Sequence, residues 1–118
     1  MKRKFIESLY ETIVKDDLVS YQQLLETAEI VPKTDEYWKS AIGLYNSLTE
    51  EKKTILLRII EQIQIDTISH LLGIMDGSST LNGYSAEPSL LLDSKKTDGE
   101  LQNLFLELIE MRDEESPG

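Results

Sequence analysis

Two ionisable residues lie four positions apart in the most apolar stretch of the chain. Asp66 and His70 fall within the run from Ile55 to Met75, and residues at this spacing share one face of a helix, so their side chains can meet. A carboxylate beside an imidazole fixes the tautomer of the ring and raises its basicity, as a general base or a metal ligand requires. Asp76 is the candidate third group of such a site.

The same residues admit a structural interpretation, which the rest of the chain favours. His70 is the single histidine and there is no cysteine, which excludes disulfides, thiol nucleophiles and cysteine-ligated metals. The sequence has no H-E-x-x-H, Walker, G-x-S-x-G or dinucleotide-binding motif. It also lacks the second helix with metal-binding carboxylates that a carboxylate metal bundle requires. We therefore expect no cofactor and no metal. We expect Asp66 and His70 to form a buried or half-buried polar pair, and their strip, with Ser69, Gly73 and Asp76, to anchor the loop that follows.

This loop is the stronger candidate for a binding surface. It extends from Gly77 to about Asp98, and connections of more than about 12–15 residues without regular structure are uncommon unless they are functional or disordered. Its hydroxyl, amide and phenol groups offer hydrogen bonds, as recognition loops do. A tolerated surface insertion is the alternative. The candidate binding residues of the helix end and the loop are Asp66, His70, Asp76, Ser78, Ser79, Asn82 and Tyr84.

Negative charge is concentrated in the second half of the chain. The net charge is −10, and residues 61–118 hold twelve acidic and three basic residues, which accounts for −9 of it. An acidic surface repels phosphate groups, so we expect no nucleic-acid binding. The same charge would suit a basic protein partner, or it serves solubility alone.

Apolar spacing and capping signals predict four helical segments in the first two thirds of the chain. Two segments, over about 5–14 and 18–28, are separated by no strong breaker and can also form one bent helix. Proline at position 32 ends the second segment, since the residue before a proline avoids the α conformation. Thr34 and Thr49 are the expected N-caps of the third and fourth helices.

The fourth helix is expected to be the centre of the fold. It is predicted from Glu50 to about Asp76, and its second half is apolar on nearly all sides, as is typical of a helix surrounded by others. An irregular or short β-like insert, about 77–97, with a type I′ turn at Asn82-Gly83, leads to the last helix. Thr97 and Glu100 form a capping box for that helix. The fold class is therefore predicted as all-α, a compact bundle of about five helices in a single domain, residues 1–118.

The sequence predicts a cytoplasmic protein that does not enter membranes. A bilayer span needs about 20 predominantly apolar residues, and the most apolar run contains four ionisable ones. Glu7 and Glu11 interrupt any apolar run behind the basic N-terminus, so no secretory signal is expected.

Three functions are compatible with these features. In being short, acidic, helical and free of cysteine, with one polar loop, the chain resembles small bacterial immunity and antitoxin-like proteins in composition. The leading hypothesis is a non-enzymatic protein-binding module, such as an inhibitor of that kind, that engages a basic partner through its C-terminal half and the 77–98 loop. The first alternative is a small-ligand or metal-dependent enzyme that uses Asp66, His70 and Asp76. The second is a structural homo-oligomer, which an exposed face with Trp38 and Tyr45 would indicate.

Overall fold

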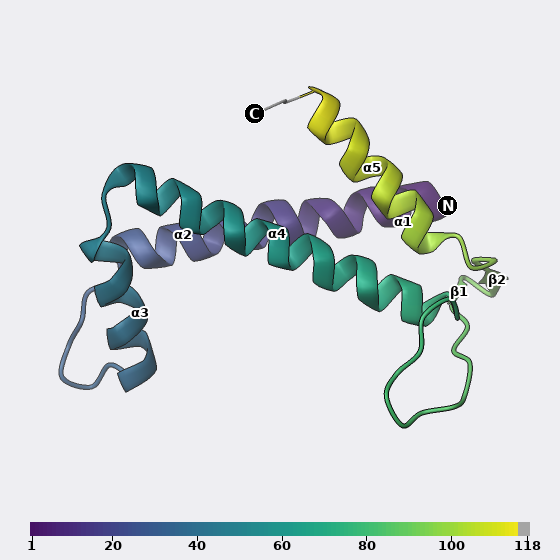
Figure 1. Cartoon of the computed structure of the whole chain (residues 1–118), viewed down its shortest axis with the longest axis horizontal. Helices are drawn as coiled ribbons and strands as arrows, with labels where there is room; N and C mark the ends of the chain where they lie inside the picture. The colour runs from purple at the N-terminus through teal and green to yellow at the C-terminus, as the bar shows by residue number, and fades with distance from the viewer. Residues whose placement is uncertain (116–118) are drawn as a thin grey trace.

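The computed structural model describes residues 1–115 and is mainly helical (Figure 1). Its elements are α1 (Lys2–Leu9), the π-helical η1 (Tyr10–Asp16), α2 (Asp17–Thr27), α3 (Glu36–Ser47), α4 (Glu50–Met75), β1 (Leu91–Leu92), β2 (Lys95–Lys96) and α5 (Leu101–Glu115). The all-α prediction is therefore confirmed in its main feature. None of the helices in residues 1–115 has the length and apolar character needed to cross a membrane.

The first three helical segments follow one another without a break and form one rod. Leu9 and Asp17, which flank η1, both have right-handed helical backbone. The π-helical turn offsets the hydrogen-bond ladder of the rod, and Gln64 of α4 donates to the carbonyl oxygen of Ile13 there, at 3.4 Å. The described residues thus contain four separate helices rather than the five predicted, because the two N-terminal segments are joined.

The main core lies where the N-terminal rod, the C-terminal half of α4 and α5 meet. Its buried residues are Ile6, Tyr10, Val14, Ile65, Ile68, Leu72, Leu101 and Phe105. A second, smaller group of buried side chains, Leu25, Ile42 and Tyr45, lies at the other end of the rod, where α3 contacts α2. The long rod and α4 connect these two centres.

The helices do not form the compact bundle that the sequence predicts. The molecule measures 49 × 37 × 25 Å, and its radius of gyration is 17.8 Å, whereas a compact domain of this length has about 13.5 Å. In Figure 1, α3 and the loop after α4 project from opposite ends of the long helices, so the chain has the outline of an arch. The all-α prediction holds, and the predicted compactness is not confirmed.

The segment between α4 and α5 is β-like, as predicted. Leu81 and Tyr84 form an antiparallel bridge around the Asn82-Gly83 turn. Only Gly83 of the two turn residues has a positive φ, of 75°, so the predicted type I′ turn is not formed there. Further on, β1 and β2 pair antiparallel around Asp93 and Ser94, which both have positive φ. Two consecutive residues of positive φ are what a type I′ hairpin turn requires, because its twist matches that of the paired strands.

Candidate functional site

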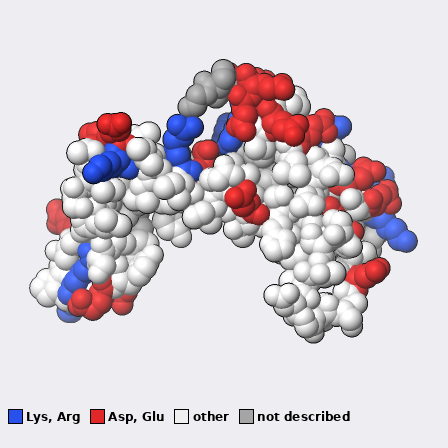
Figure 2. All heavy atoms as spheres, in the orientation of Figure 1, with Lys and Arg blue, Asp and Glu red and all other residues white. Residues whose placement is uncertain are grey.

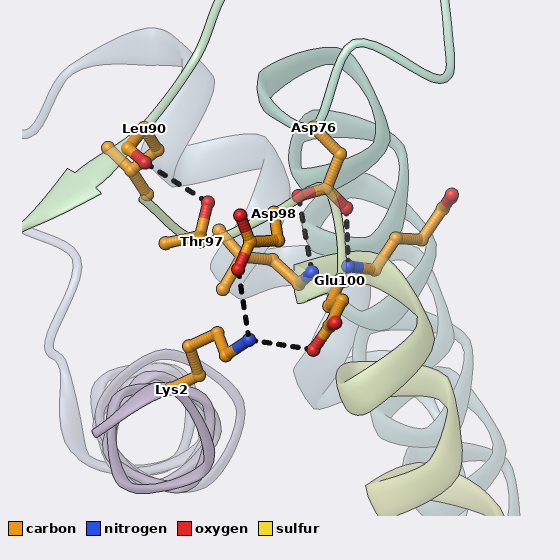
Figure 3. A network of polar contacts seen from close by, with 8 residues as sticks. Lys2, Asp76, Leu90, Thr97, Asp98 and Glu100 are labelled. Carbon is orange, nitrogen blue, oxygen red and sulfur yellow. Dashed lines mark hydrogen bonds and ion pairs between the residues drawn. The ribbon is translucent and has the colours of Figure 1, made fainter. Parts of the chain in front are cut away.

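Asp76 joins the end of α4 to the start of α5. Its two carboxylate oxygens accept hydrogen bonds from the backbone nitrogens of Leu101, at 3.1 Å, and Gln102, at 2.8 Å (Figure 3). The first N–H groups of a helix have no partner within the helix, and the helix dipole favours a negative charge there. Both oxygens of Asp76 are therefore used to hold α5 in place.

The capping box predicted for α5 is wrong. Thr97 is buried, and its hydroxyl oxygen donates to the carbonyl oxygen of Leu90 at 3.1 Å, as its backbone nitrogen does at 3.2 Å. Glu100 instead accepts a hydrogen bond from Lys2 at 2.7 Å (Figure 3). Thr97 thus closes the hairpin of β1 and β2, and the cap is supplied by Asp76.

Small residues of α4 let α5 and the loop approach closely, as the sequence predicts. A Cβ atom at Gly73 would lie 2.9 Å from the side chains of Gln102 and Ser79, closer than real Cβ contacts. The Gln102 amide donates to the carbonyl oxygen of Ser69 at 3.0 Å. The carbonyl oxygen of Gly73 accepts from the backbone nitrogens of Ser78 and Ser79 at 2.9 and 3.1 Å. Ser78 and Ser79 therefore serve to fix the start of the loop.

Asp66 and His70 lie outside this network. Both are exposed on α4, and Asp66 accepts a hydrogen bond from Gln62 at 2.9 Å. The buried or half-buried pair expected from the sequence does not form, because this side of α4 faces solvent. Residues 1–115 contain no group of three His, Asp or Glu side chains placed to hold a metal ion. The structure therefore does not bring Asp66, His70 and Asp76 together as a set of metal ligands.

The tip of the loop is exposed. Asn82 occupies the turn, and Leu81 and Tyr84 on either side of it are exposed. A cavity of about 120 Å³ lies between this tip and Ile74 at the end of α4. Pockets for drug-sized ligands have volumes of about 300–1,000 Å³, so this one suits a single inserted side chain better than a small-molecule substrate.

The most distinctive surface of the molecule lies along α4 and was not identified from the sequence. Between Thr54 and Leu71 the exposed positions occur as adjacent pairs every four residues, which makes two parallel rows. The apolar row consists of Ile55, Ile59, Ile63, Thr67 and Leu71. The polar row consists of Thr54, Arg58, Gln62, Asp66 and His70. The four large side chains of the apolar row are each more than half exposed.

An apolar cavity of about 270 Å³ lies between α2, α3 and the N-terminal half of α4. Its lining includes the exposed Tyr37 and Leu44, together with Trp38, which is half-buried, and Tyr45, which is buried. The Tyr45 hydroxyl donates to Glu26 at 2.9 Å. Burial, together with this hydrogen bond, raises the pKa of Tyr45 to about 12. Tyr45 is thus buried and Trp38 is half-buried, so the exposed face with Trp38 and Tyr45 that would indicate a homo-oligomer is not present.

The acidic side chains gather elsewhere, most densely over α5 (Figure 2). Part of this charge is paired with the basic N-terminus, since Lys2 contacts Glu100 at 2.7 Å and Arg3 contacts Glu107 at 3.4 Å. The hydrogen bond from Lys2 to Glu100 raises the pKa of the Lys2 amine. The excess charge that favoured a basic partner is therefore partly neutralised within the molecule.

Comparison of the chain with protein-family models, with characterised proteins and with solved structures finds no match. Among the residues proposed from the sequence, Asp76, Ser78 and Ser79 hold the fold together. Asp66 and His70 belong to the polar row of α4, and Asn82 and Tyr84 lie on the exposed loop.

Proposed function

We propose that the chain is a non-enzymatic protein-binding module and that its binding surface is the exposed side of α4. The observation that carries this proposal is the apolar row, in which Ile55, Ile59, Ile63 and Leu71 are each more than half exposed. Large exposed apolar patches on a folded protein mark interaction surfaces. Apolar anchors at helical spacing are also the usual means by which one helix docks against another protein.

The surface area of the chain supports this proposal. The accessible surface is 8553 Å², whereas a compact monomer of its mass, 13.5 kDa, exposes about 6,500 Å². The difference is about 2,000 Å², and a standard protein–protein interface buries about 800 Å² on each partner. The open arrangement of the helices therefore leaves enough surface for a stable interface.

Further apolar and aromatic side chains stand at the two ends of α4. Tyr37 and Leu44 are exposed on α3, next to the cavity of about 270 Å³. Leu81 and Tyr84 are exposed on the loop at the opposite end (Figure 1). Tyrosine is enriched at interfaces because it combines a large apolar ring with a hydrogen-bonding group. These residues would extend the contact beyond the apolar row.

Site-specific photo-crosslinking in the native cell tests the proposal. A photoreactive phenylalanine analogue placed at Ile59 should form covalent adducts with protein. The matched position is Leu106 on α5, which is an exposed apolar residue of a helix that carries many acidic groups. Adducts at Ile59 but not at Leu106 support the proposal, whether the captured chain is a second copy or another protein. Equal yields at the two positions, or no adducts at Ile59, would contradict it.

A further inference from the structure

We infer that the partner of the α4 surface is a second copy of this chain, with its α4 antiparallel to the first across a two-fold axis near Gln62 and Ile63. This inference rests on the proposed function, because it names the occupant of the same surface. In a two-fold interface the same patch is used twice, and if residue i contacts residue j, then j contacts i. The surface must therefore complement itself.

Both rows of α4 meet this requirement, and the two-fold axis that each row needs passes through nearly the same point of the helix. A two-fold axis perpendicular to α4 keeps each row on its own side and reverses its direction, so positions equally far from the axis meet. In the apolar row, Ile63 meets Ile63 of the second copy, and Ile59 meets Thr67. In the polar row, Gln62 meets Gln62 of the second copy, and Arg58 meets Asp66. Apolar side chains thus contact uncharged ones, and the two charged positions contact each other.

The charges of the polar row select the antiparallel arrangement. Arg58 and Asp66 are both exposed and are eight residues apart on α4, which corresponds to a rise of about 12 Å, too far for a direct ion pair within one chain. Packed helices lie about 8–10 Å apart, within reach of an arginine side chain that extends to a carboxylate on the other helix. A parallel two-fold pair would instead place the polar row of each copy against the apolar row of the other, which would leave Arg58 and Asp66 facing isoleucines without a charged partner.

Residues four apart form ridges that are inclined to the helix axis, so two helices that bring such rows together cross at an angle of about 50°. A row of residues four apart winds around the helix by about 40° per step. Two helices therefore keep contact only near the middle of the rows. The residues nearest the axis are Ile59, Gln62, Ile63 and Asp66.

Area and net charge are also compatible with a dimer. An obligate homodimer buries about 2,000–5,000 Å² in total, or about half of that on each subunit, and each chain exposes about 2,000 Å² more than a compact monomer would. The net charge of −10 on each chain opposes association. However, the acidic groups are densest over α5 (Figure 2), and Asp66 is the one acidic residue in the two rows, so the rows of α4 can meet with little repulsion.

Charge exchange at the two charged positions of the polar row tests the inference. The molar mass of the wild-type chain, measured by light scattering or sedimentation, should be twice the 13.5 kDa of the monomer. Arg58→Asp and Asp66→Arg should each raise the dimer dissociation constant by at least about tenfold, because each creates two like-charge contacts. Both positions are exposed, so the variants should fold, which circular dichroism would check. The double variant should restore dimerisation.

A wild-type chain that remains monomeric at all accessible concentrations would overturn the inference. A dimer that the single exchanges do not weaken, or that the double exchange does not restore, would also overturn it. In either case the proposed function is still decided by the crosslinks at Ile59, since adducts with a different protein would support it without a dimer. The two proposals can therefore fail separately.

A cysteine trap locates the axis independently. The chain has no cysteine, so Ile63→Cys introduces a single thiol next to the axis, where two copies bring their Cβ atoms within the range of about 3.5–4.5 Å that a disulfide requires. Under mild oxidation this variant should form disulfide-linked dimers rapidly. Leu106→Cys, on α5, is the matched control and should remain largely monomeric. Equal rates of cross-linking for the two variants would contradict the antiparallel α4 interface.

Discussion

Replacing Asp76 by alanine should destabilise the protein more than any other single loss of a carboxylate. The change leaves the N–H groups of Leu101 and Gln102 without their acceptors, and Leu101 is fully buried, so water cannot readily replace the missing oxygen. Loss of an N-cap carboxylate costs about 0.5–2 kcal/mol, and a hydrogen bond to a charged group contributes about 1.5–3 kcal/mol. We therefore expect the free energy of unfolding to fall by about 2–4 kcal/mol.

Urea unfolding followed by circular dichroism measures this change. The protein concentration should be the same for all variants, because any association makes the apparent stability depend on it. Asp76→Asn retains one acceptor oxygen and removes the negative charge at the helix dipole, so it should cost about 1–2 kcal/mol. Glu110→Ala, an exposed carboxylate on α5 itself, should change the stability by at most about 0.5 kcal/mol.

This prediction is refuted if the free energy of unfolding of Asp76→Ala lies within about 0.5 kcal/mol of that of the wild type. It is also refuted if Glu110→Ala costs as much as Asp76→Ala, since the effect would then reflect the loss of any acidic side chain from this region. A loss that Asp76→Asn shares in full would also contradict the prediction, because the acceptor oxygen that asparagine retains would then contribute nothing.

Three further predictions concern Thr97, Tyr45 and Gly73. Thr97→Val should lower the free energy of unfolding by about 0.5–1.5 kcal/mol in the same assay, because it removes the hydroxyl hydrogen bond to the carbonyl oxygen of Leu90 and leaves that oxygen only the backbone N–H of residue 97; an unchanged stability would contradict this. Tyr45, whose pKa is raised from 10.0 to about 12 by burial and by the hydrogen bond to Glu26, should ionise near pH 12 in an ultraviolet titration. Its neutral form favours the folded state, so this stability is fully present below pH 10.0 and lost as the pH rises to about 12. Gly73→Ala should show little of the gain of about 1 kcal/mol expected in a helix, because its Cβ would lie 2.9 Å from the side chains of Gln102 and Ser79, and most of that gain should appear only together with Gln102→Ala and Ser79→Ala.

The ends of a helix can be predicted from the sequence where the capping residue directly adjoins the helix in the chain. α4 was predicted from Glu50 to about Asp76 and extends from Glu50 to Met75, and Thr49 accepts the expected bond from the backbone nitrogen of Lys52 at 3.2 Å. The cap of α3 is Asp35 rather than Thr34, one residue later than predicted. Such shifts are common, because neighbouring polar residues compete for the same position.

The cap of α5 could not be predicted, because it comes from a residue distant in the chain. Thr97 and Glu100 have the spacing of a capping box, yet Asp76, 25 positions before Leu101, supplies the carboxylate. Local spacing carries no information about which segment the fold brings to the helix end. For the same reason Asp76 was predicted as a candidate site residue, whereas its contacts are structural.

The exposed side of α4 could not be predicted from periodicity. Apolar residues on most sides of a helix predict a central position, and Ile65, Ile68 and Leu72 do belong to the main core. The pattern does not show whether the remaining apolar side is covered by the same chain, by another chain or by solvent. Asp66 and His70 were expected to be at least half-buried on this basis, and the fold leaves both exposed.

In the cell, protein should cover the apolar row of α4. Chemical labelling of single thiols tests this most directly. Ile59→Cys and Leu106→Cys each place one thiol in a chain that otherwise has none, at positions that are both exposed in the single chain. Treating intact cells with a membrane-permeant maleimide gives the two rates of modification. We expect the thiol at position 59 to react several-fold more slowly than the thiol at position 106, and the difference to disappear in denaturant. Equal rates in the cell would show that no protein covers the apolar row.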